Sequence, residues 1–311
     1  MENKIHDTGK FREYLLLKKY SPATADTVLK ITGYFIQWVQ GEQIEELADV
    51  SHQDIVGFMQ WCGKQGVSQK TIANYLTHIG KLYRFLISEG ETKENPVAHV
   101  KVQGIKRKVF HDIVSIEELH QLYQSYTTDI PKDAGKQMPP QQRNHLSRCR
   151  NKVILGLLVY QGLRVEEVAA LKLQDVQLRA GTITIHSQRR TAARTMQLES
   201  HQVYEMINYI QEIRKAFLQV YGASDRLFLQ WQQGKNFYGV TQSMLRNLQG
   251  TNPRIKNFEQ LRASVIVGWL RQYDLRKVQY MAGHRYVSST EAYKAGIIDA
   301  LQEDIAKFHP L

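Results

Sequence analysis

Residues near the end of the chain have the types and spacing needed to attack a phosphodiester. His284 follows Gly283, Tyr293 stands nine positions later, and Arg262 lies in an apolar segment upstream. A tyrosine phenol titrates near ~10, so it is a weak nucleophile unless cations stabilise the developing charge and another group takes its proton. Arginine suits such a pocket, because its planar guanidinium binds two phosphate oxygens and stays charged when desolvated. The pattern predicts Tyr293 as a nucleophile assisted by Arg262 and His284.

A second arginine is expected to complete the phosphate clamp. Arg164 follows Gly162 directly after the apolar run 153–160. Because glycine commonly ends helices, Arg164 is expected at a corner between two helices, where it faces a cleft. Glu167 lies one helical turn further and could orient Arg164.

Four motifs together carry a family resemblance. Gly-Leu-Arg-x-x-Glu at 162–167, x-x-Leu-Arg at 259–262, Gly-His at 283–284 and Tyr293 resemble the tyrosine recombinases, also called the phage integrase family. Each motif is weak by itself, but their order and spacing extend over about the last 190 residues. The resemblance implies DNA cleavage without metal or nucleotide, in which the tyrosine forms a 3′-phosphotyrosyl link. The freed 5′-hydroxyl then attacks a partner strand.

The resemblance also implies a role for each matching residue. Arg164 and Arg262 would stabilise the charge of the pentacoordinate phosphorane, as fixed cations do where charge develops. His284 would bond a non-bridging oxygen or manage the proton of Tyr293. When each residue is considered alone, a salt bridge is the structural alternative for Arg262. A capping or packing role is the alternative for His284.

Two positions depart from the family pattern. Glu259 stands where the family usually has histidine, and its negative charge beside a dianionic transition state is unfavourable. We expect Glu259 instead to hold Arg262 in place. The polar run 186–191 also lacks the family's general-acid lysine, so Arg189 is the expected substitute, with Arg190 or Lys172 next.

Two rival functions fit parts of this pattern. A catalytically reduced relative would assemble on DNA sites without cutting, and a relaxing topoisomerase would cut without exchanging strands. The retained tyrosine, arginines and histidine argue against the first. The small N-terminal domain and an apolar stripe in the tail 295–308 favour a recombinase over the second. In the family such a tail docks on a neighbouring protomer, which implies a homo-tetramer on DNA and a monomer in solution.

The composition indicates a polyanionic partner. The 311 residues carry a formal net charge of +11 and an isoelectric point near 9.5. Double-stranded DNA is the expected partner, and an acidic membrane surface is the rival. No apolar run reaches the roughly 18 residues of a spanning helix, and no signal-peptide core is evident. We therefore expect a cytoplasmic protein, associated with the nucleoid when it acts on DNA.

Metal and cofactor chemistry are not expected. The chain has two cysteines, and its 11 histidines show no His-Glu-x-x-His spacing. Cys62 lies on an apolar helical face and is interpreted as a buried thiol.

Hydrophobic periodicity predicts a mainly α protein. Residues 1–100 should form a helical DNA-clasping bundle with helices starting after Ser21, Ser51 and Ser68. Residues 101–112 should be a basic linker, with Lys106, Arg107 and Lys108 crossing DNA or merely aiding solubility. Residues 113–311 should form a mostly helical catalytic domain with a small antiparallel sheet and a C-terminal docking helix.

One helix of the bundle carries a candidate DNA surface. Between the apolar positions of the helix after Ser68 lie polar and basic residues, which are Lys70, Asn74, His78 and Lys81. They could bond DNA phosphates or simply form a solvated face.

In the catalytic domain, hydrophobic periodicity and the positions of capping and turn residues predict the remaining elements. Residues 127–150 are expected to be an irregular connection. The predicted helices and strands are a helix after Ser115, helices 151–161 and 165–173, strands 176–178, 182–185 and 194–198, and helices 201–221, 241–248, 258–270 and 275–281.

Overall fold

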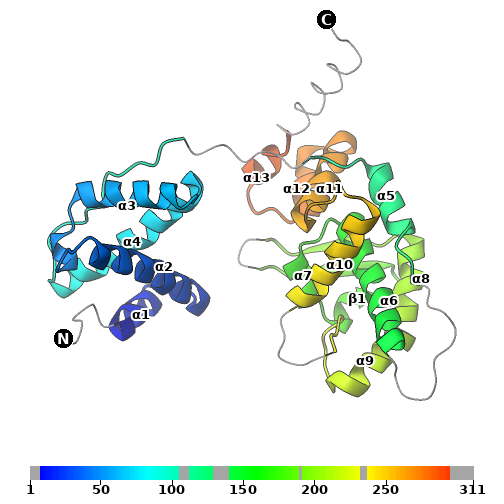
Figure 1. The fold of residues 1–311 in the computed structure, drawn as a ribbon. Helices are drawn as coiled ribbons and strands as arrows, with labels where there is room; N and C mark the ends of the chain where they lie inside the picture. The colour runs from blue at the N-terminus through cyan, green and yellow to red at the C-terminus, as the bar shows by residue number, and fades with distance from the viewer. Residues whose placement is uncertain (1–7, 105–111, 129–139, 189–190, 232–236, 295–311) are drawn as a thin grey trace, which may run out of the picture. The chain divides into compact units, whose positions relative to one another are not determined.

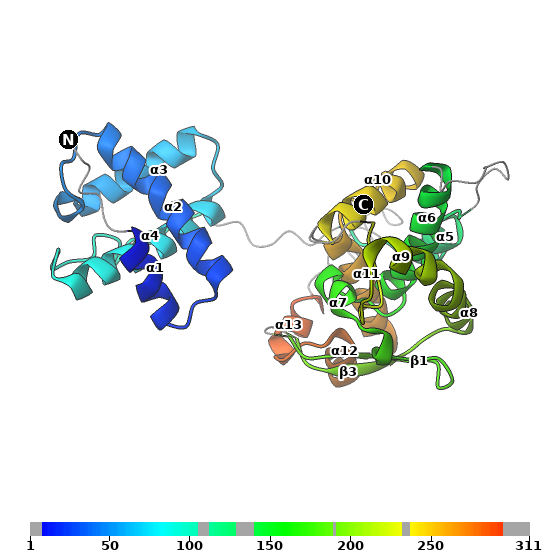
Figure 2. The same ribbon diagram turned by 90° about the horizontal axis from the view of Figure 1, so that it is seen from below.

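The computed structural model describes residues 8–104, 112–128, 140–188, 191–231 and 237–294. The chain forms two compact units, Met1–Val109 and Phe110–Leu311 (Figures 1 and 2). The division between them falls within the predicted linker 101–112. Within both units, helices predominate and one small antiparallel sheet is present in the second, which confirms the mainly α fold class.

The first unit is a bundle of helices that begin at serine caps. Its elements are α1 (Thr8–Leu17), α2 (Pro22–Gly41), the 3-10 helix Leu47–Asp49, α3 (His52–Lys64) and α4 (Gln69–Glu89). Ser21, Ser51 and Ser68 each accept a backbone N–H from the first turn, and Ser51 forms a full capping box with Asp54. These caps satisfy donors that have no partner inside the helix. The predicted starts of α2, α3 and α4 are therefore confirmed.

Aromatic side chains fill the core of the first unit. Phe35 packs edge-on against Phe58 with ring centroids 5.1 Å apart, and the Cys62 side chain is fully buried beside them. The sequence did not lead us to expect α1, which buries only Phe11 and Leu15. Two apolar contacts over ten residues give too weak a period to read from the sequence.

The second unit combines helices with three short strands. Its elements are α5 (Ile116–Gln124), α6 (Pro140–Val159), α7 (Val165–Ala170), the 3-10 helix Leu173–Asp175, β1 (Val176–Gln177), β2 (Thr182–Ile185), β3 (Arg194–Gln197), α8 (Ser200–Asn208), a π-helical segment Tyr209–Ile213, α9 (Arg214–Tyr221), α10 (Tyr238–Thr251), α11 (Phe258–Gln272), α12 (Leu275–Ala282) and α13 (Val287–Glu291).

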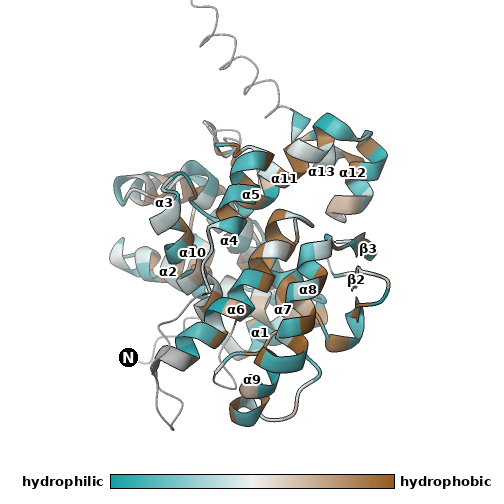
Figure 3. Cartoon of the chain, turned by 90° about the vertical axis from the view of Figure 1, so that its right-hand side faces the viewer, coloured by the Kyte–Doolittle hydropathy of each residue, from teal (hydrophilic) through white to brown (hydrophobic). Residues whose placement is uncertain are grey.

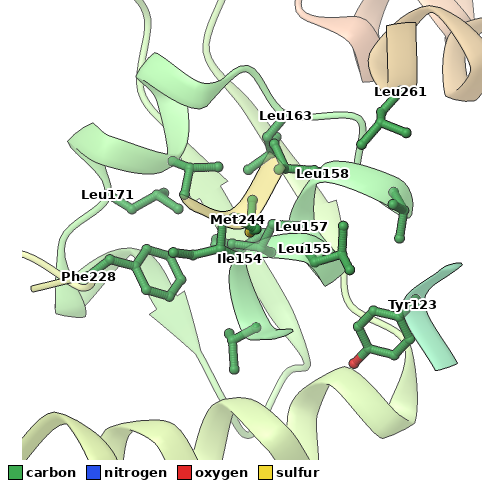
Figure 4. Packing of buried hydrophobic residues seen from close by; sticks show 14 of the residues in the cluster. Tyr123, Ile154, Leu155, Leu157, Leu158, Leu163, Leu171, Phe228, Met244 and Leu261 are labelled. Carbon is green, nitrogen blue, oxygen red and sulfur yellow. The ribbon is translucent and has the colours of Figure 1, made fainter. Parts of the chain in front are cut away.

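Helix α6 lies at the centre of this unit. Figure 4 shows its apolar residues surrounded by side chains from several other elements, which are Leu163, Leu171, Phe228, Met244 and Leu261. Residues 153–155 and 157–159 are all buried, so the second half of the helix is enclosed on every side. The prediction that 127–150 is irregular is wrong from Pro140 onward, because proline at the first helical position starts a helix.

The sheet has the predicted strands in the order β1-β2-β3, antiparallel throughout. Ile183 pairs with Met196 and Ile185 pairs with Arg194, so these residues lie on one face of the β2-β3 hairpin. Helix α12 lies beside β3 (Figure 2). The hairpin is thereby placed next to the end of the chain that carries the Gly-His motif.

Two other predictions need correction, and one helix was missed. The helix predicted for 201–221 is interrupted by the π-helical segment, which inserts an extra residue per turn. Helix α7 ends at Ala170 rather than at 173, and α13 was not predicted. The tail 295–308 lies outside the described residues.

The start of the second unit is anchored on α11 and the loop before it. Arg254 donates to Asp112 at 2.8 Å and to Glu118 at 2.7 Å. The side-chain amide of Gln260 donates to the Asp112 carbonyl at 2.8 Å, and the backbone N–H of Val114 donates to a serine of α11 at 2.9 Å. These contacts fix the point at which the chain enters the second unit.

Figure 3 shows hydrophilic and hydrophobic residues alternating around individual helices, as amphipathic helices require. Within the described ranges, no helix combines the length and the apolar character that crossing a membrane demands.

Candidate functional site

Arg262 is a deeply buried cation of the site. It lies in α11 with a relative exposure of 2%, and it donates to the carbonyls of Gly162 and Ala282, the latter at 2.6 Å. Burial, and next the charge of Arg164, lower the pKa of Arg262 to about 10. Its Nε has no hydrogen-bond partner among the described residues. A buried donor without a partner is a position that an anion would satisfy.

Gly162 makes the corner from which Arg164 projects. It has a φ of +56°, and a Cβ there would lie 3.1 Å from both Val265 and Trp269 of α11. Only glycine adopts this backbone conformation without strain and also admits such close packing. Arg164 follows as the N-cap of α7, as predicted, and its buried Nε also lacks a partner within the described part of the chain.

Glu167 does not orient the Arg164 side chain as we expected. Its carboxylate accepts the backbone N–H of Arg164 at 2.9 Å, because the third residue of a helix is placed to reach back to the N-cap. The same carboxylate binds the guanidinium of Arg194 through two hydrogen bonds of 2.8 Å. Burial raises the pKa of Glu167, but the bonds and charge of Arg194 outweigh this, so the pKa stays below its ordinary value.

Arg194 connects this corner to the Gly-His turn. Its side chain is fully buried, and a Cβ at Gly283 would lie 2.3 Å from its Nη1. From the sequence, Arg194 was placed only at the start of the predicted strand 194–198 and was given no role in the site. The alternation of the strand could have revealed its buried position, because Arg194 shares the inward face of β3 with Met196.

His284 stands at the end of α12, where Gly283 turns the chain with a φ of +66°. Its Nδ1 lies 2.9 Å from Thr290 Oγ1, and its Nε2 lies 3.4 Å from Arg262 Nη2. Burial, and next the charge of Arg262, lower the pKa of His284 to about 4. The imidazole is therefore neutral at physiological pH.

Tyr293 lies against His284. Their rings are stacked with centroids 5.8 Å apart and an interplanar angle of 12°. Helix α13 sets this position, because the backbone N–H of Tyr293 donates to the carbonyl of Thr290 at 3.0 Å. The structure thus brings Tyr293, His284 and Arg262 together, with Arg164 near enough to influence the pKa values of both His284 and Arg262.

Glu259 contacts Arg164 rather than Arg262, so the expected partner is wrong. The carboxylate lies 3.8 Å from Arg164 Nη1, and the two side chains are 55% and 30% exposed. Arg262 faces inward from α11 and donates to carbonyl acceptors, whereas Glu259 is an exposed residue in the first turn of the same helix. Glu259 thus places a negative charge beside the more exposed arginine.

Residues on either side of the hairpin tip contact the Gly-His turn and the residue after it. Arg189 and Arg190 fall outside the described residues, but Gln188 and Thr191 on either side of them pair with each other. The backbone N–H of Ala192 donates to the Gly283 carbonyl at 2.9 Å, and Arg285 donates to the Gln188 carbonyl at 2.8 Å.

Lys172, the other cation considered for the general acid, binds elsewhere. Its Nζ forms an ion pair with Asp225 at 2.7 Å. The hydrogen bond and charge of Asp225 raise the pKa of Lys172 above its ordinary value.

On α4, the predicted DNA-contacting residues divide into two kinds. Lys70 and Asn74 are exposed, whereas His78 and Lys81 are half-buried. Lys81 lies 3.3 Å from His78 Nδ1 and 4.5 Å from the ring centroid of Tyr20. Burial, and next the charge of Lys81, lower the pKa of His78.

Residues 106–108, which hold Lys106, Arg107 and Lys108, lie outside the described residues. Among the residues that are described, no three His, Cys, Asp or Glu side chains gather in a way that could hold a metal ion.

Two family matches account for most of the chain. Residues 131–296, more than half of the sequence, match the phage integrase family, and residues 9–90 match its N-terminal SAM-like domain.

Relatives that match over nearly their whole length are also tyrosine recombinases. The chain is 25% identical to tyrosine recombinase XerC of Bacillus pumilus, covering 100% of this chain and 98% of the relative. It is 28% identical to tyrosine recombinase XerD of Oceanobacillus iheyensis, covering 90% and 89% of the two chains.

Among solved structures, the fold is similar to XerH site-specific recombinase in a post-cleavage complex with palindromic difH substrate. The TM-score is 0.71 at 17% identity, covering 98% of this chain and 85% of that one. A lambda integrase dimer bound to a COC′ core site gives 0.62 at 14% identity, with 92% and 75% covered. The motifs, the fold and these matches agree, and the chain belongs to the phage integrase family of tyrosine recombinases.

Proposed function

We propose that this protein is a site-specific DNA recombinase that cuts and rejoins strands through a 3′-phosphotyrosyl intermediate. One observation carries the proposal. Tyr293, His284 and Arg262 meet in one place, with the two rings stacked at 5.8 Å and the guanidinium 3.4 Å from the imidazole. No metal or nucleotide is needed, because the energy of the phosphodiester is kept in the covalent link.

The arginines supply the charge that the reaction needs. Arg164 and Arg262 each have a buried Nε without a partner among the described residues, and both would donate to the scissile phosphate. Fixed donors of this kind stabilise the transition state more than the ground state. Arg262 keeps its proton although its pKa is lowered to about 10, so it remains a cation at neutral pH.

His284 serves as a neutral donor rather than as a cation. Its pKa of about 4 leaves the imidazole uncharged, so one ring nitrogen carries a hydrogen that can be donated to a phosphate oxygen. Arg189 is proposed to stabilise the leaving 5′-oxygen, with water supplying the proton, because an arginine gives up its own proton reluctantly.

The first unit is proposed to hold the DNA. Lys70 and Asn74 are exposed on α4 and would bond phosphates, with His78 and Lys81 beside them. We propose that four protomers assemble on DNA through the tail from residue 295 onward, and that the protein acts in the cytoplasm at the nucleoid. Truncation after Lys294 should then spare binding to one half-site and weaken cooperative binding to two in gel shifts, whereas unchanged cooperativity would remove the tail from the assembly.

One observation favours the rival function, a relative that binds DNA without cutting. Glu259 places a carboxylate 3.8 Å from Arg164, one of the two proposed phosphate ligands. Cleavage assays therefore decide between the two functions.

The test begins with the DNA sequences that the purified protein selects from a random pool. Nicked suicide substrates built on the selected site should form a denaturant-resistant adduct with the wild-type protein, both with and without excess chelator. Tyr293→Phe removes one oxygen and should abolish the adduct while DNA affinity stays within about twofold.

Tyr286→Phe is the matched control, because Tyr286 is an exposed phenol on the same segment. This variant should form the adduct normally. Adducts that persist in Tyr293→Phe would place the nucleophile elsewhere. Tight site-specific binding with no adduct from the wild-type protein would support the non-cutting relative.

A further inference from the structure

Thr290 is a buried hydroxyl residue that contacts two members of the site. It has a relative exposure of 0% and lies in α13. Its Oγ1 is 2.9 Å from His284 Nδ1, and its backbone carbonyl accepts the N–H of Tyr293 at 3.0 Å. Thr290 thus joins the proposed nucleophile to the proposed phosphate donor.

The hydrogen bonds of His284 depend on its tautomer. The ring is neutral, since burial and the charge of Arg262 lower its pKa to about 4. A neutral imidazole carries one N–H, and its other nitrogen can only accept. The two tautomers therefore present opposite hydrogen-bonding character at Nε2.

Without DNA, the surroundings favour the hydrogen on Nδ1. Arg262 Nη2 lies 3.4 Å from Nε2, and a guanidinium only donates, so Nε2 must accept. Nδ1–H then donates to the Thr290 hydroxyl at 2.9 Å. A phosphate oxygen reverses this requirement, because it only accepts. Nε2 must then carry the hydrogen, and Nδ1 needs a donor.

We propose that Thr290 is a positioning residue that lets His284 change tautomer when a phosphate enters the site, so that Nε2–H faces the non-bridging oxygen. This inference rests on the proposed function. A hydroxyl can serve both tautomers because it donates or accepts after rotation about its C–O bond. The proton that Nδ1 releases to water is replaced by one that Nε2 takes from water, so the charge does not change.

Two substitutions separate the hydroxyl from the space it fills. Thr290→Val replaces the hydroxyl with a methyl of similar size, and Thr290→Ser keeps the hydroxyl. Thr290→Val should slow single-turnover adduct formation about tenfold to a hundredfold, as expected when the partner that orients a reacting group is lost. DNA affinity should stay within about twofold. Thr290→Ser should form the adduct within about threefold of the wild-type rate.

A spectroscopic measurement reports the tautomer directly. In protein labelled with ¹⁵N-histidine, the His284 signal is identified by its loss in His284→Gln. The DNA-free wild-type protein should show hydrogen on Nδ1. Tyr293→Phe bound to DNA, which holds the uncleaved complex, should show hydrogen on Nε2. This measurement does not depend on the folding of the Thr290 variants.

The outcomes distinguish the inference from the proposed function. The same His284 tautomer with and without DNA, or wild-type cleavage by folded Thr290→Val, would overturn the role of Thr290 alone. If the wild-type protein forms no adduct, the proposed function fails, and the tautomer measurement still decides whether DNA binding changes His284.

Discussion

Glu259 should slow this protein's own reaction, and replacing it with glutamine should relieve that effect. Its carboxylate lies 3.8 Å from Nη1 of Arg164, the arginine that we propose binds the scissile phosphate, and it carries a negative charge there. Glu259→Gln keeps the size of the side chain and removes the charge. We expect faster cleavage and tighter binding of the scissile phosphate.

The distance of 3.8 Å between Glu259 and Arg164 sets the scale for the effect of the Glu259 charge. For two unit charges at this separation, Coulomb's law gives ~1 kcal/mol in water and ~4 kcal/mol at an effective dielectric constant of 20. The side chains of Arg164 and Glu259 are 30% and 55% exposed, so solvent screening places the pair near the lower figure. A gain of about 1 kcal/mol corresponds to roughly fivefold in a rate or an affinity.

The assay is single-turnover adduct formation on a nicked substrate at several salt concentrations. Glu259→Gln should exceed the wild-type rate by about twofold to fivefold, and the advantage should shrink as salt screens the charge. Glu166→Gln is the matched control, because Glu166 is an exposed carboxylate of α7 that forms no ion pair among the described residues. The reasoning fails if Glu259→Gln cleaves more slowly than wild type, or if Glu166→Gln gains as much.

Further predictions concern the turn, the hairpin and the histidine. Gly283→Ala should destabilise the protein by at least about 1 kcal/mol in urea unfolding, because the left-handed backbone and the Arg194 guanidinium exclude a Cβ, whereas Gly250→Ala on open α10 should not. Arg189→Ala should slow cleavage by about 10² to 10³, and a substrate with sulfur as the leaving atom should restore the rate; wild-type speed on the ordinary substrate would exclude Arg189. The unfolded state binds a proton at His284 below about pH 6.5, and the folded state does so only below about pH 4. The free energy of unfolding should therefore decrease by about 1 kcal/mol for each unit by which the pH is lowered from about 6.5 to about 4. The decrease should be smaller in His284→Gln. Equal pH slopes for both proteins would contradict the assignment.

Local signals made much of the fold predictable from the sequence. The caps at Ser51 and Ser115 and the change to a period of two after Asp175 involve neighbours within a few residues, and all three were confirmed. Helix α13 was missed because five residues with one buried side chain carry no measurable period. Pro140 begins α6 in a polar stretch whose apolar half comes later, so the sequence favoured a loop.

The sequence predicted which residues form the site, but not which of them contact one another. Motif order identified Arg164, Arg262, His284 and Tyr293, which the structure brings together. The partner of Glu259 was wrong, because which carboxylate faces which arginine depends on how two distant helices pack. The contact between Thr290 and His284 was missed for a related reason, since it requires the turn and short helix that separate them.

The anchor at the start of the second unit has a practical consequence for preparing that unit alone. A fragment beginning at or before Asp112 keeps both partners of Arg254 and the carbonyl that Gln260 binds. A fragment beginning at Ser115 would leave the Gln260 amide, which is fully buried in the intact chain, without that acceptor. Expression boundaries chosen from the family match alone, which starts at residue 131, would remove α5 as well and expose the apolar surface that it covers.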